Sequence, residues 1–121
     1  TGWNGRFDVA AKDGAKVAYT FNQGLLDYDC FAIAKGAPNK DLAMKFLAEI
    51  SKPQYQAEFT KYITSGPTNK KAYEGGAIDA AFAKTLPSHP DNAGKQLPVD
   101  LDWYIKFEAQ ASSAYQNMLT E

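Results

Sequence analysis

Two aspartates, Asp27 and Asp29, lie one residue apart in the stretch GLLDYDCFAIAKGAPN (residues 24–39), which is otherwise apolar and strand-like. Alternate side chains of an extended chain share a face, so both carboxylates would point the same way, roughly 7 Å apart. No Lys or Arg lies between Lys16 and Lys35. A carboxylate buried here would need a counter-charge from a distant residue or from a ligand, and an ammonium group would supply it.

Three interpretations of this pair are open from the residues alone. In the first, both carboxylates face one cleft and bind an amine. In the second, Asp27 lies in the turn after Gly24 and faces water, and only Asp29 enters a strand. In the third, the pair works as in a glycosidase, although nothing else in the sequence resembles a sugar-processing site.

Trp3 is the other candidate for ligand binding, because it stands with Asn4 between Gly2 and Gly5. A tryptophan on such a tight turn offers its ring face to an alkylammonium group through apolar contact and cation–π attraction. The same residue would equally serve as a core side chain, so both roles stay open.

Composition argues against several other functions. The 121 residues are 45% hydrophobic and 22% charged, and 13 basic and 14 acidic side chains give a net charge of -1. Neither a disordered chain nor a nucleic-acid partner is favoured. Single Cys and His residues, Cys30 in an apolar stretch and His89 in a loop expected to be solvated, are too few for a disulfide or a nucleophile–base pair. Phosphate-loop and zinc-hydrolase motifs are absent from the sequence, so we expect no catalytic residues, no metal and no cofactor.

The elements that would position these residues begin with strands and one helix. RFDVAAKDG (residues 6–14) predicts a short helix that ends at Gly14. VAYTFN (17–22) and DCFAIA (29–34) predict strands, because both are rich in β-branched and aromatic residues. Two strands are too few for a stable sheet. Since TGWNGR also shows no leader and no initiating methionine, we expect the missing strands in further sequence.

Helical patterns dominate the rest of the chain. Asn39 is the expected N-cap of an amphipathic helix, and Pro53 begins the next helix. The apolar faces of these two helices would consist of Ala43, Phe46, Leu47 and Ile50 in the first, and Tyr55, Phe59, Tyr62 and Ile63 in the second. AIDAAFAKTL (77–86) predicts a weaker helix, and a long final helix starts near Asp100. The buried face of the final helix would consist of Tyr104, Phe107, Ala111, Tyr115 and Met118.

Three motifs occur in an order that is typical of one known family: WNG at residues 3–5, AIAKGAPN at residues 32–39 and GPTN at residues 66–69. Together they resemble the C-terminal part of the periplasmic spermidine/putrescine-type binding proteins of ABC transporters, and the similarity covers nearly the whole chain. Related receptors take 4-aminobutyrate or other small amines. The resemblance implies that the N-terminal part of a receptor is supplied by the same chain or by a companion chain.

The family's fold implies an α/β architecture, here a fragment of the two-lobe periplasmic-binding-protein (type II) fold with hinge-crossing strands. By that resemblance, residues 1–28 form part of the second lobe. Residues 29–75 hold the return crossing and helices that pack on the first lobe, and residues 76–121 hold C-terminal helices that return to the second lobe. Closure of the lobes around the ligand would be the signal that the membrane permease reads.

The resemblance also implies roles for particular residues. Trp3 matches the tryptophan that stacks on the ligand's aliphatic chain, and Asp29 matches the strand aspartate that binds an amine. Asp27 falls where some polyamine receptors carry a tryptophan, which argues against a long polyamine. The remaining ligand-binding candidates are Tyr28, Ser65, which falls near a tyrosine of the family, and Tyr104, which falls near a polar contact residue.

The sequence therefore predicts the C-terminal part of a non-catalytic periplasmic receptor that captures a small amine and delivers it to an ABC permease. The alternative is an interaction or scaffold segment of a split or engineered binding protein whose ligand contacts lie mostly elsewhere. An enzyme on the same scaffold would need its base or nucleophile from other sequence.

Overall fold

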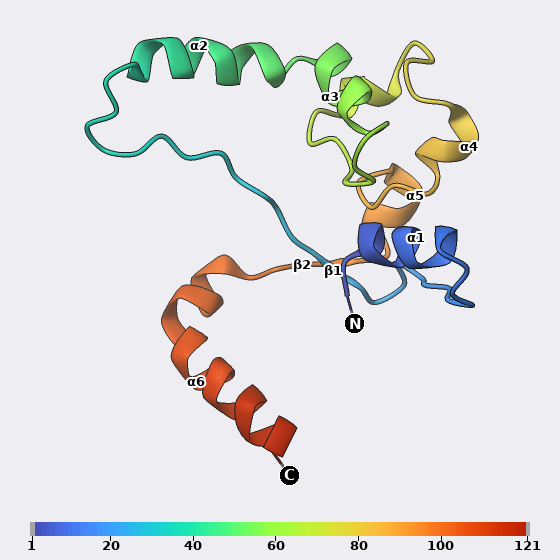
Figure 1. Cartoon of the computed structure of the whole chain (residues 1–121), viewed down its shortest axis with the longest axis vertical. Coiled ribbons are helices and arrows are strands. Elements are labelled where there is room, and N and C mark those ends of the chain that lie inside the picture. The colour runs from blue at the N-terminus through green and yellow to red at the C-terminus, as the bar shows by residue number, and fades with distance from the viewer. Residues whose placement is uncertain (1, 121) are drawn as a thin grey trace.

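The computed structural model of the chain describes residues 2–120 (Figure 1). Its elements are α1 (Asn4–Lys12), β1 (Leu25–Leu26), α2 (Lys40–Ile50), α3 (Pro53–Phe59), the 3-10 helix η1 (Lys70–Tyr73), α4 (Ala80–Ala83), α5 (Pro90–Ala93), β2 (Leu97–Pro98) and α6 (Leu101–Thr120). Helices α1, α3, α4 and α5 lie together in one compact part, whereas α2 and α6 extend away from it as two arms (Figure 1).

The core of the compact part is built mainly from small side chains. Its buried apolar residues come from α3, η1, α4 and the turns beside them: Ala57, Ala72, Ile78, Ala83 and Leu86. Tyr73 and Phe82 pack against this cluster. Because three of the five are alanines, the cluster removes little apolar area from water, and its hydrophobic stabilisation is correspondingly small.

Hydrogen bonds from side chains fix the GPTN turn between α3 and the chain that precedes α5. The Gln56 side chain accepts the Asn69 N–H at 2.8 Å, and the Asn69 amide donates to the Ser51 carbonyl at 3.1 Å. Ser88 Oγ donates to the Pro67 carbonyl at 2.7 Å. The turn is therefore a structural junction that joins two parts of the compact region.

The strands β1 and β2 form a parallel pair in which Leu25 lies opposite Leu97 and Leu26 opposite Pro98. The Leu97 N–H donates to the Gly24 carbonyl at 2.8 Å, and the Val99 N–H donates to the Leu26 carbonyl at 2.9 Å. Two segments far apart in the sequence thus leave the compact part side by side and in the same direction. One leads through Asp27 towards α2, and the other leads into α6.

The predicted strands over residues 17–22 and 29–34 are wrong for the described chain, in which the parallel pair forms at Leu25–Leu26 instead. Extended residues become a strand only when a second strand accepts their backbone hydrogen bonds. Within residues 2–120 no second strand lies beside either segment. Tyr19 and Phe21 pack as aromatic side chains near α1 (Phe7 to Tyr19, 5.9 Å between ring centroids; Tyr19 to Phe21, 5.5 Å).

The predicted helices are confirmed more closely than the strands. The first one ends at Lys12 and is followed by Gly14 with φ of 93°, the left-handed conformation that glycine adopts readily. Asn39 and Pro53 occupy the expected first positions of α2 and α3, although the Asn39 side chain makes no capping bond. Helix α3 ends at Phe59, so Tyr62 and Ile63 lie beyond it, and the helix expected over 77–86 shortens to α4.

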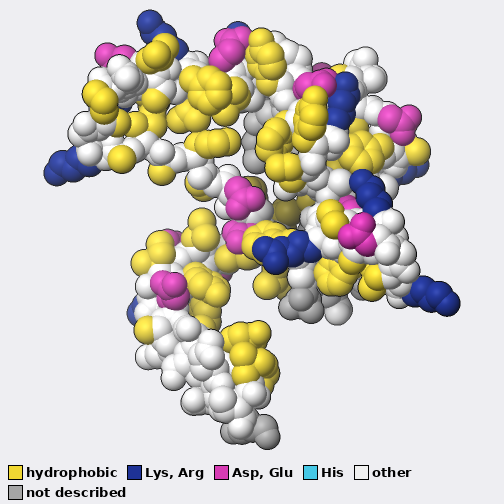
Figure 2. Space-filling view, in the orientation of Figure 1, with side chains coloured by type: hydrophobic (Ala, Val, Ile, Leu, Met, Phe, Trp, Pro, Cys, Tyr) yellow, Lys and Arg dark blue, Asp and Glu magenta, His cyan; other side chains and the backbone are white. Residues whose placement is uncertain are grey.

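The long final helix is confirmed as α6, but its predicted buried face is wrong. No residue of α6 is buried, and Tyr104, Tyr115 and Met118 are about half exposed. Figure 2 shows apolar side chains on the open sides of both arms. None of the helices within residues 2–120 has the length and hydropathy needed to cross a membrane.

His89 is not the solvated loop residue that the sequence predicted. It caps α5, where its Nδ1 accepts the Asp91 N–H at 3.3 Å, and only 18% of its side chain is exposed. Its ring packs edge to face on Tyr73, with 5.5 Å between ring centroids. The residue therefore has a structural role in the compact part.

Candidate functional site

The N-terminal turn carries Trp3 and is fixed to a distant loop. The Asn4 side chain donates to the Thr64 carbonyl at 2.8 Å. A Cβ on Gly5 would lie 3.1 Å from the enclosed Thr64 hydroxyl, so only glycine allows so close an approach without movement. Trp3 stands next to Asn4, and Ser65 stands next to Thr64. Two of the predicted site residues are therefore brought to neighbouring positions.

Trp3 lies at the start of α1 rather than in the core. Its carbonyl accepts the Arg6 N–H at 3.0 Å, which begins the helix, while 57% of the residue is exposed. The alternative role as a core side chain is thus wrong within the described chain. The indole is available to contact a molecule or a segment that covers it.

The second turn of α1 is tied to the segment that leads into β1. The Tyr19 hydroxyl donates to Asp8 Oδ1 at 2.8 Å. Partial burial, together with the carboxylate of Asp8, raises the pKa of Tyr19 to about 12. This contact places the Trp3 turn and β1 within one unit, as the ribbon also shows (Figure 1).

The paired aspartates follow directly after β1. Asp27 Oδ1 accepts the N–H of its neighbour Tyr28 at 2.8 Å. Of the second interpretation of this pair, the exposure of Asp27 is observed, whereas Asp27 follows β1 instead of lying in a turn and Asp29 enters no strand of the described chain. Asp27, Tyr28 and Asp29 are all exposed, and neither carboxylate forms an ion pair with any residue of the described chain. Both carboxylates are therefore open to a cation from outside these residues.

Tyr104 lies in the first turn of α6, directly after β2, and is 49% exposed. Its neighbour Trp103 is 48% exposed, and their rings are 6.0 Å apart in an edge-to-face arrangement. The sequence reasoning did not single out Trp103. The signal that would have found it is an aromatic pair in the first turn of a helix that follows an acidic, proline-containing loop.

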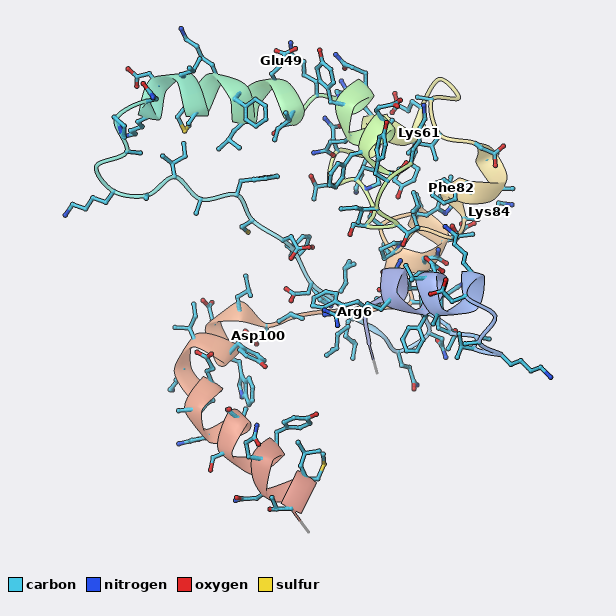
Figure 3. The ribbon with its side chains drawn as sticks, viewed as in Figure 1. Arg6, Glu49, Lys61, Phe82, Lys84 and Asp100 are labelled. Atoms are coloured by element: carbon cyan, nitrogen blue, oxygen red, sulfur yellow. The ribbon has the colours of Figure 1, made fainter. Side chains whose placement is uncertain are left out.

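The parallel strands bring these groups to one edge. Asp27, Tyr28 and Asp29 follow the carboxyl end of β1, and Trp103 and Tyr104 follow the carboxyl end of β2. Ligands of open α/β folds bind in the crevice outside the carboxyl ends of the strands. Figure 3 shows the two ends of this region, with Arg6 where α1 meets the strands and Asp100 at the start of α6. Trp3 and Ser65 thus lie at neighbouring positions, and the aspartates and Tyr104 follow the carboxyl ends of two paired strands.

Two open hollows lie elsewhere on the surface. One hollow of about 490 Å³ separates the extended segment around residues 29–34 from α2. Its lining is mostly apolar and includes Phe31, Ile33, Met44 and Leu47. Another of about 340 Å³ lies beside Phe21, Lys84 and Lys95. None of the predicted site residues lines either hollow. The candidate site is thus one open wall, which other residues must complete to enclose a ligand.

The chemistry available at this wall is that of binding. Exposed carboxylates attract a cation, and the indole and phenol rings offer apolar faces to its carbon chain. Within residues 2–120 no group of three or more His, Cys, Asp or Glu residues could hold a metal ion. Cys30 is a free, exposed thiol with no basic partner in the same segment.

Comparison with known proteins gives a consistent set of relatives. The sequence profile described as "Bacterial extracellular solute-binding protein" matches residues 1–87. The chain is 35% identical over 103 residues to the gamma-aminobutyric acid-binding protein of Pseudomonas aeruginosa, which covers 85% of this chain and 29% of that protein.

Solved structures are also similar over almost the whole chain. An ABC transporter substrate-binding protein from Bradyrhizobium japonicum USDA 110 is 37% identical with a TM-score of 0.81, covering 99% of this chain and 37% of that chain. The PBP MotA from A. tumefaciens B6, in complex with glucopine, is 39% identical with a TM-score of 0.77, covering 95% of this chain and 36% of that chain. The PBP AgtB from A. tumefaciens R10, in complex with agropinic acid, is 31% identical with a TM-score of 0.72, covering 98% and 37%.

These relatives are about three times as long as the chain, which spans 29% of the curated protein and 36 to 37% of the solved chains. Within that share the architecture is the one that these binding proteins have. Residues 2–120 show a mostly helical part of it, with one parallel strand pair.

Proposed function

The chain belongs to the family of bacterial extracellular solute-binding proteins, and from this premise we propose that it forms one wall of the ligand site of an ABC-transporter receptor for a small amine. The observation that carries the proposal is the position of Asp27 and Asp29 with Tyr104 at the carboxyl ends of one parallel strand pair. Exposed carboxylates beside aromatic rings favour a primary ammonium group with a short carbon chain.

Among small amines, we propose a ligand of the 4-aminobutyrate class rather than a long polyamine. A relative of 35% identity is named as a gamma-aminobutyric acid-binding protein, and Asp27 stands where some polyamine receptors carry a tryptophan. Such a ligand has a carboxylate at its other end, which needs a cationic group. We expect that group away from the aspartate pair, because the aspartates supply only negative charge.

We further propose that the site closes as a cleft between two lobes in the periplasm and that the closed form is read by the permease. Residues 1–28 and 76–121 would belong to the second lobe, and residues 29–75 would hold the return crossing and the helices of the first. The core, however, crosses the boundary between residues 75 and 76. It packs Ala57 and Ala72 from one side of that boundary against Ile78 and Leu86 from the other. We therefore expect residues 53–96 to move as one body when the lobes close.

The test is calorimetric titration of a receptor that contains this chain, with 4-aminobutyrate, putrescine and spermidine in parallel. We expect Asp29→Asn to weaken amine binding tenfold or more, because it removes the charge that faces the ammonium group. Asp41→Asn, on the distant first turn of α2, is the control and should keep the parent affinity.

Parent affinity in Asp29→Asn would overturn the assignment of Asp29 and favour the alternative, a scaffold segment whose ligand contacts lie elsewhere. Tight binding of a diamine in place of 4-aminobutyrate would mean that a second carboxylate faces Asp29 across the cleft. Absence of binding by all three ligands would overturn the amine proposal while leaving family membership unaffected.

A further inference from the structure

We propose that Trp103 is a ligand-contacting residue that forms an aromatic wall of the amine site and selects for the length of the ligand's carbon chain. The inference rests on the proposed function and adds a specificity-determining residue to it. Its starting point is that Trp103 is large, half exposed and next to the strand pair, although neither the motifs nor the periodicity of the sequence singled it out.

The position of Trp103 follows from an unbroken series of backbone contacts. The Leu26 carbonyl, directly before Asp27, accepts the Val99 N–H at 2.9 Å. Asp100 comes next and caps α6, where its Oδ1 accepts the Trp103 N–H at 2.9 Å. The turn that carries Trp103 and the segment that carries the aspartates therefore both start from the carboxyl ends of the same strand pair.

The indole is supported on one side and free on the other. Its ring lies 5.4 Å from that of Phe107, one turn further along α6, and 6.0 Å from that of Tyr104. These contacts restrict its rotamers, so little conformational entropy is lost when the exposed face meets a ligand. A supported aromatic ring with a free face is the arrangement that aromatic ligand walls use.

The charges around this turn favour an ammonium ligand over an anionic one. Asp100 and Asp102 precede the indole, and the first basic residue of α6 is Lys106. The Lys106 ammonium already lies over the Phe107 ring, 5.1 Å from its centroid. No such cation of the described chain lies over the Trp103 ring, so its face is available to the ammonium group of a ligand.

The test compares Trp103→Ala and Trp103→Phe in a receptor that contains this chain. The probes are 4-aminobutyrate and the ω-amino acids with one methylene fewer and one more. We expect Trp103→Ala to weaken 4-aminobutyrate binding about tenfold and to abolish the preference among the three chain lengths, because the methylenes lose their wall. Trp103→Phe should bind within about threefold of the parent and keep the preference.

Tyr115→Ala, further along α6, is the control for a general effect on the helix and should leave affinity and chain-length preference unchanged. Thermal unfolding without ligand separates binding from folding. A Trp103→Ala receptor that unfolds at the parent temperature and keeps both affinity and chain-length preference would overturn the inference. The proposed function would survive that result, whereas failure of the parent receptor to bind any amine would overturn both.

Discussion

At the scale of single residues, Gly66 has the closest surroundings of the glycines in the described chain. A Cβ at this position would overlap Ser88 Oγ and would lie 2.7 Å from the Ser88 backbone nitrogen. Ser88 cannot easily move, because its hydroxyl donates to Pro67 and also bonds the Tyr73 hydroxyl at 2.8 Å. We predict that Gly66→Ala lowers the free energy of unfolding by about 1–3 kcal/mol, the usual cost of overpacking. The measurement is urea unfolding of the receptor that contains the chain.

Gly94→Ala is the matched control for this prediction. The nearest atom to a Cβ on Gly94 is the Pro90 carbonyl oxygen at 3.7 Å, an ordinary contact, and the backbone there is right-handed helical. We expect this substitution to be neutral or slightly stabilising. Equal stability of the two variants would contradict the close packing of Gly66 on Ser88.

Single residues were predicted with uneven success, and the reasons are physical. The free carboxylate of Asp29 follows from the absence of basic residues nearby in the sequence, whereas the sequence left the role of Trp3 open and the structure shows it exposed. Trp103 was missed because its place after the strand that pairs with the aspartate segment depends on the pairing of Leu25 with Leu97, which no local pattern encodes. The GPTN motif indicated the family, but the motif alone did not predict why its glycine is needed. The structure gives the reason, because a side chain at Gly66 would overlap Ser88.

At the scale of elements, α4 depends on the residue that begins it. Asp79 Oδ1 accepts the N–H groups of Ala81 at 3.0 Å and Phe82 at 2.9 Å. A helix of four residues has few other bonds, and it places Ala83 in the core. We predict that Asp79→Ala lowers the free energy of unfolding by about 1 kcal/mol, as loss of an N-cap typically does. Asp79→Ser keeps a capping oxygen and should recover most of that loss.

The readout for α4 is thermal unfolding of the three proteins under one set of conditions. Since Asp79 is exposed and far from the proposed site, affinity for 4-aminobutyrate should not change with either substitution. If Asp79→Ser were as unstable as Asp79→Ala, the capping bonds would not be the cause of the effect.

Helices were predicted better than strands because the information for them is local. Capping residues and apolar periodicity within one segment determine a helix, as Pro53 and Asn39 show at the starts of α3 and α2. A strand needs a partner that is distant in the sequence. DCFAIA has the composition of a strand but lies extended and unpaired among the described residues, and the pair that does form consists of only two residues on each side.

At the scale of the whole molecule, the extended segment and the two arms leave much apolar surface uncovered. Phe31 is 74% exposed, and α2 and α6 contain no buried residue. Soluble proteins seldom leave patches of this kind open to water unless another surface covers them. Relatives about three times as long as the chain have enough sequence to provide that cover.

Amide hydrogen exchange distinguishes a covered segment from an open one. In the 121-residue chain alone, we predict that the amides of residues 29–34 exchange at nearly the unprotected rate, because they donate no backbone hydrogen bond within the described chain. In a receptor that contains the chain, the same amides should be protected about a hundredfold or more, because the segment then pairs as a strand. Residues 75–77, an exposed loop with Gly75 and Gly76 at positive φ, are the control and should exchange rapidly in both proteins. Rapid exchange of residues 29–34 in the receptor would mean that the segment is a linker in the assembled protein, and that Asp29 is presented to the ligand from a flexible chain rather than from a strand.

The same comparison tests whether residues 53–96 form one body. If the receptor protects only residues 29–34 and α2, and residues 53–96 exchange as they do in the chain alone, the moving body begins after α2. That result would support one rigid unit around the core.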